Sequence, residues 1–428
     1  MASSNATPVV TVFLRHHGEV LLFRRSDDVD SYPGQWSAVT GHVEDQDPRA
    51  SALQEIEEET GLQEHDVTFA QQGTAFTVED SDRDTPWQVH PFLFDADTRS
   101  IKTNWETAEA EWDSPTVMLR RDTVPDLWTS YRRVAPSILG VTNDTTHGSA
   151  YLSLRALEVL RDRAGMLATT DGAGIEDARS RLVATAHRLL EARPSMAALA
   201  NRLHRVMHTS RPELSPITVE TNAHEAIQGA LAADANAAAQ AAAQIGGAHV
   251  LTLSHSGTVL DALQRADPAP TVTIAVSAPG GEGVEVAERL ANAGLDVTLL
   301  PDAAGARRLS EGSIDAMLVG ADTVRPSGGI VNKVGTYGAA LAAHRADVPV
   351  YAACATDKIA VKDDASTDES APMQSVYNGP VDLTVWAPRF DTTPPDLITG
   401  GILTERGALS PSEVPAVAEE LAGLRTWM

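Results

Sequence analysis

Three glutamates lie close together in the acidic stretch "GHVEDQDPRASALQEIEEETGL", where Glu58 and Glu59 follow Glu55 by three and four residues. On a helix, side chains at these spacings share a face, and like charges there repel by about 0.2–0.5 kcal/mol per pair. Such a face is either solvated surface or the site of a bound cation. Magnesium combines one or two carboxylates with waters and substrate phosphates. The spacing therefore favours a Mg²⁺ (or Mn²⁺) site, and a solvated acidic surface is the alternative.

The element that must position these carboxylates is a helix with clear start and stop signals. Asp47 can cap the free N–H groups, and Pro48 suits the first helical position. Gly61 can take the left-handed conformation that ends a helix. We therefore predict a helix over residues 48–60. Ahead of it, "PVVTVFLRHHGEVLLFRRS" reads as two strands joined by a turn.

The stretch resembles the Nudix box, the loop–helix–loop signature of Mg-dependent hydrolases that cleave nucleoside diphosphates linked to another group. The residues that carry the resemblance are Gly41, Glu44, Glu55, Ile56, Glu58, Glu59, Gly61 and Leu62. The resemblance implies that Glu55, Glu58 and Glu59 ligate the metal, with Glu44 assisting. It also implies that the metal polarises the bridging phosphate while a bound water becomes the nucleophile.

Two features depart from the family pattern. Gln54 stands where the family has an arginine that steadies the glutamates, and a glutamine amide does this more weakly. The stretch from Gly41 to Glu55 is one residue shorter than the family spacing. Both departures put turnover in more doubt than metal binding. For the proton acceptor, "AEAEW" offers Glu109 and Glu111 as weak candidates.

Polar side chains follow several apolar runs in the second half of the chain. The runs "HVLTLS", "TVTIAVS", "DVTLL", "AMLVGAD" and "VPVYAA" alternate with helix-length segments, which predicts a parallel sheet covered by helices. Ligands bind such sheets beyond the carboxyl ends of the strands. Asp322 follows one run, Lys358 follows another, and Asn332 with Lys333 precedes a helix that could bind phosphate at its N-terminus.

This half is similar to the family of the translation initiation factor 2B alpha, beta and delta subunits, which includes the ribose-1,5-bisphosphate and methylthioribose-1-phosphate isomerases. The similarity covers roughly residues 140–428 and rests on motifs such as "LSHSGTVLDAL", "VGADTVRPSGGIVNKVGTYGAALAAH" and "FDTTPPDLITGGILTERGALSPSEV". It implies a sugar-phosphate site with Asp322 as acid/base. The substrate-binding residues it implies are Gly148, Ser149, Arg193, Ser256, Thr258, Asn332, Lys333 and Lys358.

The isomerases have a cysteine where this chain has Ser256, and they tend to have an arginine where it has His147. A thiol near pKa 8.5 can become a proton-shuttling thiolate, whereas a serine hydroxyl needs a dedicated base. The lone Cys354 reads as a buried small apolar residue. The first hypothesis is therefore a hydrolase fused to a domain that binds a sugar phosphate or nucleotide. The alternatives are a bifunctional enzyme with an aldose–ketose isomerase, and a non-enzymatic assembly protein of the translation-factor type.

The length of 428 residues predicts more than one domain, because single cores stop growing near about 250–300 residues. We expect an α/β chain: a Nudix α/β/α sandwich with a mixed sheet over residues 1–135, a linker and helical subdomain over 136–215, and a Rossmann-like parallel-sheet domain over 216–428. By resemblance, we expect a homodimer or larger homo-oligomer.

The net charge of −26 and a bias of 29 arginines against 4 lysines favour a protein adapted to high salt, where screening weakens self-repulsion. An ordinary acidic enzyme is the alternative. The absence of a basic patch argues against nucleic acid as a partner. A single cysteine, the lack of a signal-peptide core and the lack of a long apolar run favour a soluble cytoplasmic protein.

Overall fold

The computed structural model describes residues 6–43, 47–80, 86–170, 174–211, 213–363 and 369–427. It divides into two compact units. Unit 1 comprises residues 1–141, 155–188 and 212–228, and unit 2 comprises residues 142–154, 189–211 and 229–428. Among the described residues, no helix combines the length and the apolar character needed to cross a membrane.

Unit 1 is built on a mixed sheet of eight strands. The strands are β1 (Thr7–His16), β2 (Glu19–Arg25), β3 (Trp36–Ser37), β4 (Val39–His42), β5 (Val67–Gln72), β6 (Phe76–Val78), β7 (Trp87–Ala96) and β8 (Thr107–Asp113). They follow the order β3-β2-β1-β7-β5, while β4 pairs with β1, β6 with β7 and β8 with β2. The pair β1 and β7 is parallel, and the other pairs are antiparallel.

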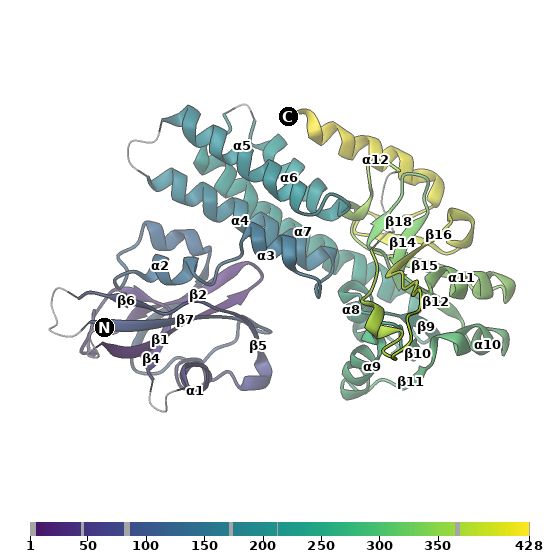
Figure 1. The fold of residues 1–428 in the computed structure, drawn as a ribbon, viewed down its shortest axis with the longest axis horizontal. Coiled ribbons are helices and arrows are strands. Elements are labelled where there is room, and N and C mark those ends of the chain that lie inside the picture. The colour runs from purple at the N-terminus through teal and green to yellow at the C-terminus, as the bar shows by residue number, and fades with distance from the viewer. Residues whose placement is uncertain are drawn as a thin grey trace. The chain divides into compact units, whose positions relative to one another are not determined.

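Helices cover both faces of this sheet, because its strands alternate apolar side chains between two cores. Val12 and Leu14 of β1 pack with Ile56 of α1 (Pro48–Thr60), whereas Phe13 of the same strand packs with Tyr131 of α2 (Leu127–Arg132). Figure 1 shows α1 and α2 on opposite sides of the strands. The expected α/β/α sandwich with a mixed sheet is confirmed.

Helix α1 begins and ends at the predicted residues. The side chain of Asp47 accepts a hydrogen bond from the backbone N–H of Arg49, and Pro48 is the first helical residue. Gly61 closes the helix with a φ of 72°. The two predicted strands ahead of the box are β1 and β2. Their turn requires positive φ at His17 (53°) and Gly18 (82°).

Within the described residues, five helices lie in sequence between α2 and β9: α3 (Ile138–Asn143), α4 (Ser149–Thr169), α5 (Ile175–Ala192), α6 (Ala197–Thr209) and α7 (Pro216–Ile245). Part of α4 belongs to unit 1, where it is tied to the sheet by buried charges. Arg15 of β1 pairs with Asp95 of β7 at 2.6 Å and with Glu158 of α4 at 3.3 Å. Arg161 of α4 donates to the backbone carbonyl of Gly18. The compact unit around the first sheet therefore includes residues beyond 135.

Unit 2 contains a sheet of seven strands: β9 (His249–Leu253), β10 (Thr271–Ala275), β11 (Val297–Leu300), β12 (Ala316–Gly320), β15 (Val350–Ala353), β17 (Gly401–Thr404) and β18 (Gly407–Leu409). Their order is β11-β10-β9-β12-β15-β17-β18. All neighbouring pairs are parallel except β17 and β18. Each predicted apolar run thus forms a strand. A smaller sheet joins β13 (Thr323–Val324), β14 (Ile330–Lys333) and β16 (Phe390–Thr393).

Helices cover the two faces of the parallel sheet, as the predicted Rossmann-like arrangement requires. The helices are α8 (Gly257–Arg265), α9 (Glu282–Asn292), α10 (Gly305–Ser310), α11 (Thr336–Arg345) and α12 (Val414–Gly423). Leu251 of β9 packs in the core formed with α10, α11 and α12, whereas Val250 packs in the core formed with α7, α8 and α9. Because β9, β10, β11, β12, β15 and β17 are parallel, their carboxyl ends lie at one edge of the sheet, where loops can hold a ligand.

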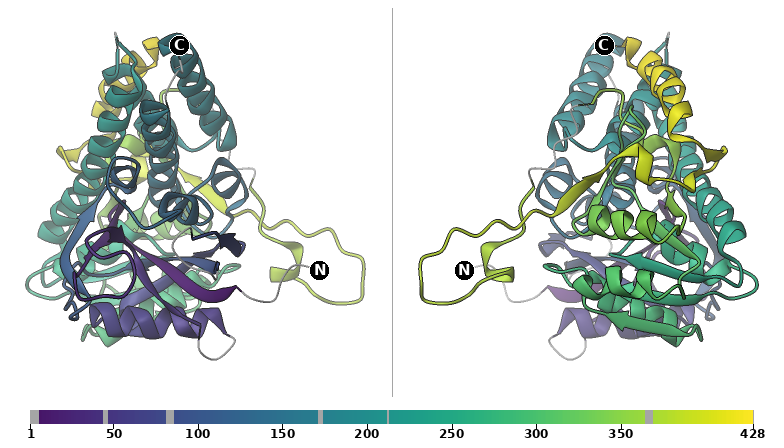
Figure 2. Two further views of the ribbon diagram at one scale, coloured as in Figure 1. Left: turned by 90° about the vertical axis from the view of Figure 1, so that its left-hand side faces the viewer. Right: turned by 90° about the vertical axis from the view of Figure 1, so that its right-hand side faces the viewer.

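One segment of unit 2 carries exposed apolar side chains. Figure 2 shows it extending away from the sheet as a long loop just before β16. Its exposed apolar residues are Met373, Val376, Val381, Leu383 and Trp386.

Candidate functional site

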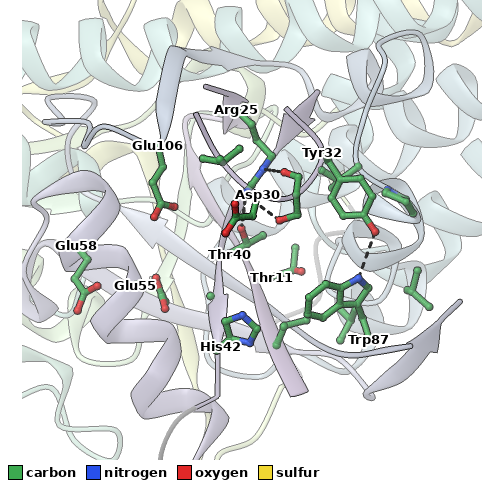
Figure 3. A pocket seen from close by; sticks show the side chains of 18 of the residues that line it. Thr11, Arg25, Asp30, Tyr32, Thr40, His42, Glu55, Glu58, Trp87 and Glu106 are labelled. Atoms are coloured by element: carbon green, nitrogen blue, oxygen red, sulfur yellow. Dashed lines mark hydrogen bonds between the residues drawn. The ribbon is translucent and has the colours of Figure 1, made fainter. Parts of the chain in front are cut away.

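A cavity of about 490 Å³ opens beside helix α1 in unit 1. Its volume is in the range of small-molecule sites, which is roughly 300–1,000 Å³. The lining residues are Val9, Thr11, Arg25, Asp28, Val29, Asp30, Ser31, Tyr32, Thr40, Gly41, His42, Glu55, Glu58, Val78, Trp87, Val89, Trp105, Glu106, Val124 and Pro125. Figure 3 shows the carboxylates of Glu55, Glu58 and Glu106 at one end and the rings of Tyr32 and Trp87 at the other.

The acidic end of the cavity is formed by Glu55 and Glu58 of α1 and by Glu106, which follows Trp105 in the loop before β8. Figure 3 shows Glu106 on the other side of this end from the helix. Gly41 lets the carboxylate of Glu55 reach the cavity, because a Cβ at residue 41 would overlap that carboxylate. The glycine of the signature is therefore required by the close approach of α1 to β4.

Glu59 has a different environment from its neighbours on the helix. Its side chain is only 6 % exposed, and Oε1 accepts a hydrogen bond of 3.0 Å from the backbone N–H of Thr40. The pKa of Glu59 is raised to about 8, mainly by burial. The Thr40 hydrogen bond and the charge of Arg25 oppose this rise, while the charges of Glu55 and Glu106 add to it. The three glutamates thus divide into two that line the cavity and one that is buried behind it.

Gln54 takes part in holding the glutamates. Its Nε2 donates to Oε1 of Glu58 at 2.8 Å. Arg25 of β2 supplies a positive charge near Glu59 and donates through Nη1 to the hydroxyl of Thr40 at 3.4 Å. Arg25 is fixed in turn by a 2.7 Å hydrogen bond to the carbonyl of Ser31. The positive charge of Arg25, which opposes the rise in the pKa of Glu59, therefore comes from a strand and not from the helix.

The other end of the cavity is aromatic and apolar. Trp87 Nε1 donates to the hydroxyl of Tyr32 at 3.3 Å, and that hydroxyl donates to Asp80 at 2.5 Å. The ring of His42 lies 5.8 Å from that of Trp87. Trp105, which is 67 % exposed and directly precedes Glu106, is a further aromatic residue in the lining of the cavity. Because the polar groups of Tyr32 and Trp87 are engaged with each other, this end offers ring faces to a ligand.

The donors at the acidic end suit magnesium in type and in number. Within the described residues, no three acidic, histidine or cysteine side chains are gathered closely enough to enclose a metal. Magnesium does not need such a cage, because it takes one or two carboxylates and completes its shell with waters and phosphate oxygens. Glu55 and Glu58 supply carboxylates on an open cavity. The site thus fits a metal that binds together with a phosphorylated substrate.

Three other predicted positions lie outside this arrangement. Glu44 falls outside the described residues. Glu109 is exposed and faces Arg24, and Glu111 pairs with Arg121 at 2.8 Å. Neither of these two carboxylates lines the cavity, whereas Glu106 does. The sequence offered no signal for Glu106, because the fold of the loop before β8 decides which glutamate of that segment faces α1.

In unit 2, Asp322 lies just beyond the end of β12. Burial raises the pKa of its carboxyl group, and the positive charges of Lys358 and Lys333 partly oppose this shift. The ammonium of Lys358 is buried and donates to the carbonyl of Ala321 at 2.7 Å. A carboxyl group with a raised pKa beside two lysines is suited to exchange protons with a bound ligand.

Several predicted residues meet at this edge of the sheet. Ser256 caps helix α8, and a Cβ on Gly320 at the end of β12 would lie 2.6 Å from the hydroxyl of Ser256. Asn332 is 3.9 Å from the same position and donates to Thr336 at 3.0 Å. Thr258, in the first turn of α8, is buried. Lys333 is buried at the end of β14, where its ammonium pairs with Glu282.

The remaining predicted residues belong to the start of α4. Ser149 is the first residue of this helix, and its buried hydroxyl has no hydrogen-bond partner within the described residues. Arg193 donates to the carbonyl of Asp144 in the loop that precedes Gly148. This region is linked to the sheet edge by Arg202, which donates to Ser153 at 2.8 Å and to Asp357 at 3.0 Å.

Cys354 follows β15 and is fully buried. Burial raises the pKa of its thiol to about 12. The thiol is therefore protonated at neutral pH and does not replace the reactive cysteine that Ser256 lacks.

Sequence reasoning missed two charged partners in unit 2. Glu282 begins α9 directly after the Gly280–Gly281 pair, and this pair is the signal that could have identified it. Arg202 has no such signal, because it lies inside the amphipathic pattern of α6, where an arginine is ordinarily exposed. Its burial follows from two carboxylates, Asp234 at 3.1 Å and Asp357 at 3.0 Å.

The sandwich, the glutamate helix and the cavity together define unit 1 as a Nudix hydrolase domain, and residues 5–134 match the NUDIX domain family. The parallel sheet with helices on both faces gives unit 2 an α/β fold. The chain belongs to the initiation factor 2 subunit family, which matches residues 145–411.

Two relatives match more than half of the chain. The ribose 1,5-bisphosphate isomerase of Haloferax volcanii is 31 % identical over 299 residues, which cover 64 % of this chain and 88 % of the relative. The methylthioribose-1-phosphate isomerase of Gemmatimonas aurantiaca is 34 % identical over 55 % of this chain and 73 % of the relative.

Among solved structures, the translation initiation factor eIF-2B of Pyrococcus horikoshii OT3 superposes with a TM-score of 0.52 and 26 % identity, covering 64 % of this chain and 95 % of that one. The 5-methylthioribose 1-phosphate isomerase of the same organism gives a TM-score of 0.54 at 20 % identity, covering 74 % and 90 %. This second similarity concerns the fold alone.

Proposed function

We propose that unit 1 hydrolyses a nucleoside diphosphate derivative with the help of Mg²⁺ or Mn²⁺. The observation that carries this proposal is the cavity with two chemically different ends, three carboxylates at one and aromatic rings at the other. A diphosphate needs metal ligands at its charged centre, and a nucleoside needs ring faces for its base. One cavity offers both.

In this proposal each side chain has a distinct task. Glu55 and Glu58 would hold the metal, with Glu59 behind them and with Glu44 as a further ligand by resemblance. A bound Mg²⁺ supplies charge neutralisation at the bridging phosphate and lowers the pKa of a bound water. Glu106 faces the same end of the cavity and would accept the proton of the attacking water. The aromatic end would hold the nucleoside.

The test is a screen of nucleoside-diphosphate compounds, with and without Mg²⁺, against the full chain and a variant carrying Glu58→Gln and Glu59→Gln. Magnesium-dependent release of a nucleoside monophosphate by the wild-type chain, lost in the variant, is the expected result. Calorimetric titration with Mn²⁺ adds a measurement that does not depend on turnover. Hydrolysis that persists in the variant, or the lack of any metal uptake in the presence of a nucleotide, would contradict the proposal.

For unit 2 we propose binding of a sugar phosphate or nucleotide at the carboxyl ends of the strands. The support is the meeting of Ser256, Asn332 and Asp322 with two buried lysines at this edge. Gly148, Ser149, Arg193 and Thr258 complete the proposed site by resemblance. Calorimetric titration with ribose 5-phosphate tests it, and heat of binding that disappears in Lys358→Gln is expected.

A second candidate activity for unit 2 is aldose–ketose isomerisation of ribose 1,5-bisphosphate. It is favoured by the raised pKa of Asp322, which could move a proton without the thiol that Ser256 replaces. The proteins similar to this chain include an isomerase of that name. Formation of ribulose 1,5-bisphosphate, abolished by Asp322→Asn, would establish the activity; binding without turnover would leave unit 2 as a binding domain.

We further propose that the chain forms a homodimer or a larger homo-oligomer through unit 2 and functions in the cytoplasm at high salt. A structure with similar fold is the tetrameric eIF2B-beta2-delta2 complex from C. thermophilum, with a TM-score of 0.52 and 22 % identity, covering 72 % and 98 % of the two chains. Light scattering in molar KCl tests this proposal, and a monomer at micromolar concentration would contradict it.

A further inference from the structure

The proposed phosphate ligand Lys333 already has an anionic partner in unit 2. Its side chain is 11 % exposed, and its ammonium forms an ion pair with Oε1 of Glu282. Glu282 is the first residue of α9, and Lys333 is the last residue of β14. The two residues lie 51 positions apart in sequence, so the fold brings them together.

The loop before α9 is shaped to allow this contact. Gly280 lies directly against the Glu282 carboxylate, and any Cβ at residue 280 would overlap it. Gly281, which caps the helix, has a φ of 79°. The second carboxylate oxygen, Oε2, is buried without a hydrogen-bond partner within the described residues. The carboxylate is therefore held at Lys333 although one of its oxygens is left unsatisfied, which is unfavourable.

Of the two lysines at this edge of the sheet, Lys333 is the one that pairs with the Glu282 carboxylate. Lys358 is engaged with the carbonyl of Ala321. Both lysines lie close enough to Asp322 to oppose the rise that burial causes in the pKa of its carboxyl group. A phosphate that binds at Lys333 must therefore take the place of the Glu282 carboxylate, because two anions cannot share one buried ammonium without strong repulsion.

We propose that Glu282 is an internal competitor for phosphate at Lys333 and thereby weakens the binding of every ligand that places a phosphate there. The inference rests on the proposed sugar-phosphate site. Displacing Glu282 lowers the affinity by the same factor for every ligand that places a phosphate at Lys333. It does not affect a ligand that leaves Lys333 untouched. Inorganic phosphate then binds weakly, whereas a sugar phosphate offsets the loss through its hydroxyl groups.

The experiment compares Glu282→Gln with Glu285→Gln in the full chain. Both glutamates lie in the first turn of α9, so each change removes one negative charge from the same turn. Of these two glutamates, Glu282 is the one described as pairing with Lys333. Inorganic phosphate, ribose 5-phosphate and ribose are titrated calorimetrically in metal-free buffer at pH 8. We expect about tenfold tighter binding of both phosphate compounds to Glu282→Gln. Glu285→Gln should change their affinity by less than about twofold, because exposed charges act weakly.

Two further variants secure the interpretation. Lys333→Gln combined with Glu282→Gln should abolish the gain in phosphate affinity, because the ammonium that binds the phosphate is gone. Glu282→Asp keeps the charge but shortens the side chain by one methylene, so that a smaller gain is expected if the contact itself is the cause. Circular dichroism confirms that each variant is folded. Ribose should bind equally to all of them.

The outcomes separate this inference from the function on which it rests. Equal affinity of wild-type and Glu282→Gln chains for ribose 5-phosphate overturns the inference and leaves the sugar-phosphate site standing. An equal gain in Glu285→Gln also overturns it, since charge and not contact would be responsible. Phosphate binding by Glu282→Gln alone supports the inference. Binding of neither phosphate compound by any protein overturns both.

Discussion

Glu59 is a carboxyl group whose burial opposes its charge. Its pKa is about 8 in the folded protein, against 4.5 for a glutamate side chain that is exposed to water. A raised pKa means that the folded state binds the proton more tightly than the unfolded state does. The contribution of this group to stability is therefore complete below about pH 4.5 and is lost as the pH rises towards 8.

This environment predicts how the stability of metal-free unit 1 depends on pH. The free energy of unfolding should fall by up to about 1.4 kcal/mol per pH unit between pH 5 and 8. In Glu59→Gln the corresponding fall should be absent, so the variant should be more stable than the wild type at pH 9. Urea denaturation at several pH values, followed by tryptophan fluorescence, measures both. Parallel pH profiles for the two proteins would contradict the assignment.

The position of Glu106 predicts its effect on turnover. If it accepts the proton of the attacking water, Glu106→Gln should lower kcat by about 10²-fold or more. Affinity for Mn²⁺ should change little, because the helix carboxylates remain. Glu109→Gln is the matched control, since Glu109 belongs to the same segment but faces Arg24 away from the cavity. A loss of Mn²⁺ affinity in Glu106→Gln would instead make Glu106 a metal ligand.

At the scale of elements, local signals were sufficient where a single segment decides the outcome. Helix α1 follows from Asp47, Pro48 and Gly61, which act within their own turns. The strands of unit 2 follow from apolar runs of the right length. Contacts between distant segments were not predictable. The hydrogen bond of Glu59 comes from a backbone N–H 19 residues away. The pair of Lys333 with Glu282 joins the end of β14 to the start of α9, 51 residues away in sequence.

Helix α6 offers a test of how such a distant contact holds two elements together. Arg202 and Arg205 both pair with Asp357, in the short helix Thr356–Lys358, at 3.0 and 2.6 Å. The side chain of Arg202 is 1 % exposed, whereas that of Arg205 is 36 % exposed. Arg202→Met should destabilise unit 2 by about 3–5 kcal/mol, because buried carboxylates lose their partner. Arg205→Met should cost less than about 1 kcal/mol.

Denaturation in urea followed by circular dichroism measures this difference. The two variants remove the same charge from the same helix and leave the same aspartate partner. A common effect of net charge would therefore shift both midpoints equally. Equal destabilisation by the two variants would show that burial of the arginine does not determine how much its ion pair with Asp357 stabilises unit 2.

At the scale of the whole molecule, the dominant physical fact is the excess of negative charge. The chain carries 59 acidic and 33 basic residues, so 26 negative charges have no basic counterpart. Exposed ion pairs contribute at most about 1 kcal/mol each and are weakened by salt. The unpaired charges repel one another, and salt reduces that repulsion by shortening the Debye length from about 10 Å at 0.1 M to about 3 Å at 1 M. We expect the screening of repulsion to outweigh the weakening of exposed ion pairs, because the net charge of −26 is large and each exposed ion pair contributes little.

The chain should therefore unfold at a higher temperature in 2 M than in 0.1 M KCl at pH 8. General salting-out could raise the midpoint as well, so the charge itself must be varied. Near pH 4.8, the isoelectric point, the net charge is zero and the repulsion disappears. If screening is the cause, the rise in midpoint with KCl should be much smaller there than at pH 8. Calorimetric scans at the two pH values test this, and an equal rise at both would assign the stabilisation to salting-out and remove the main argument for adaptation to high salt.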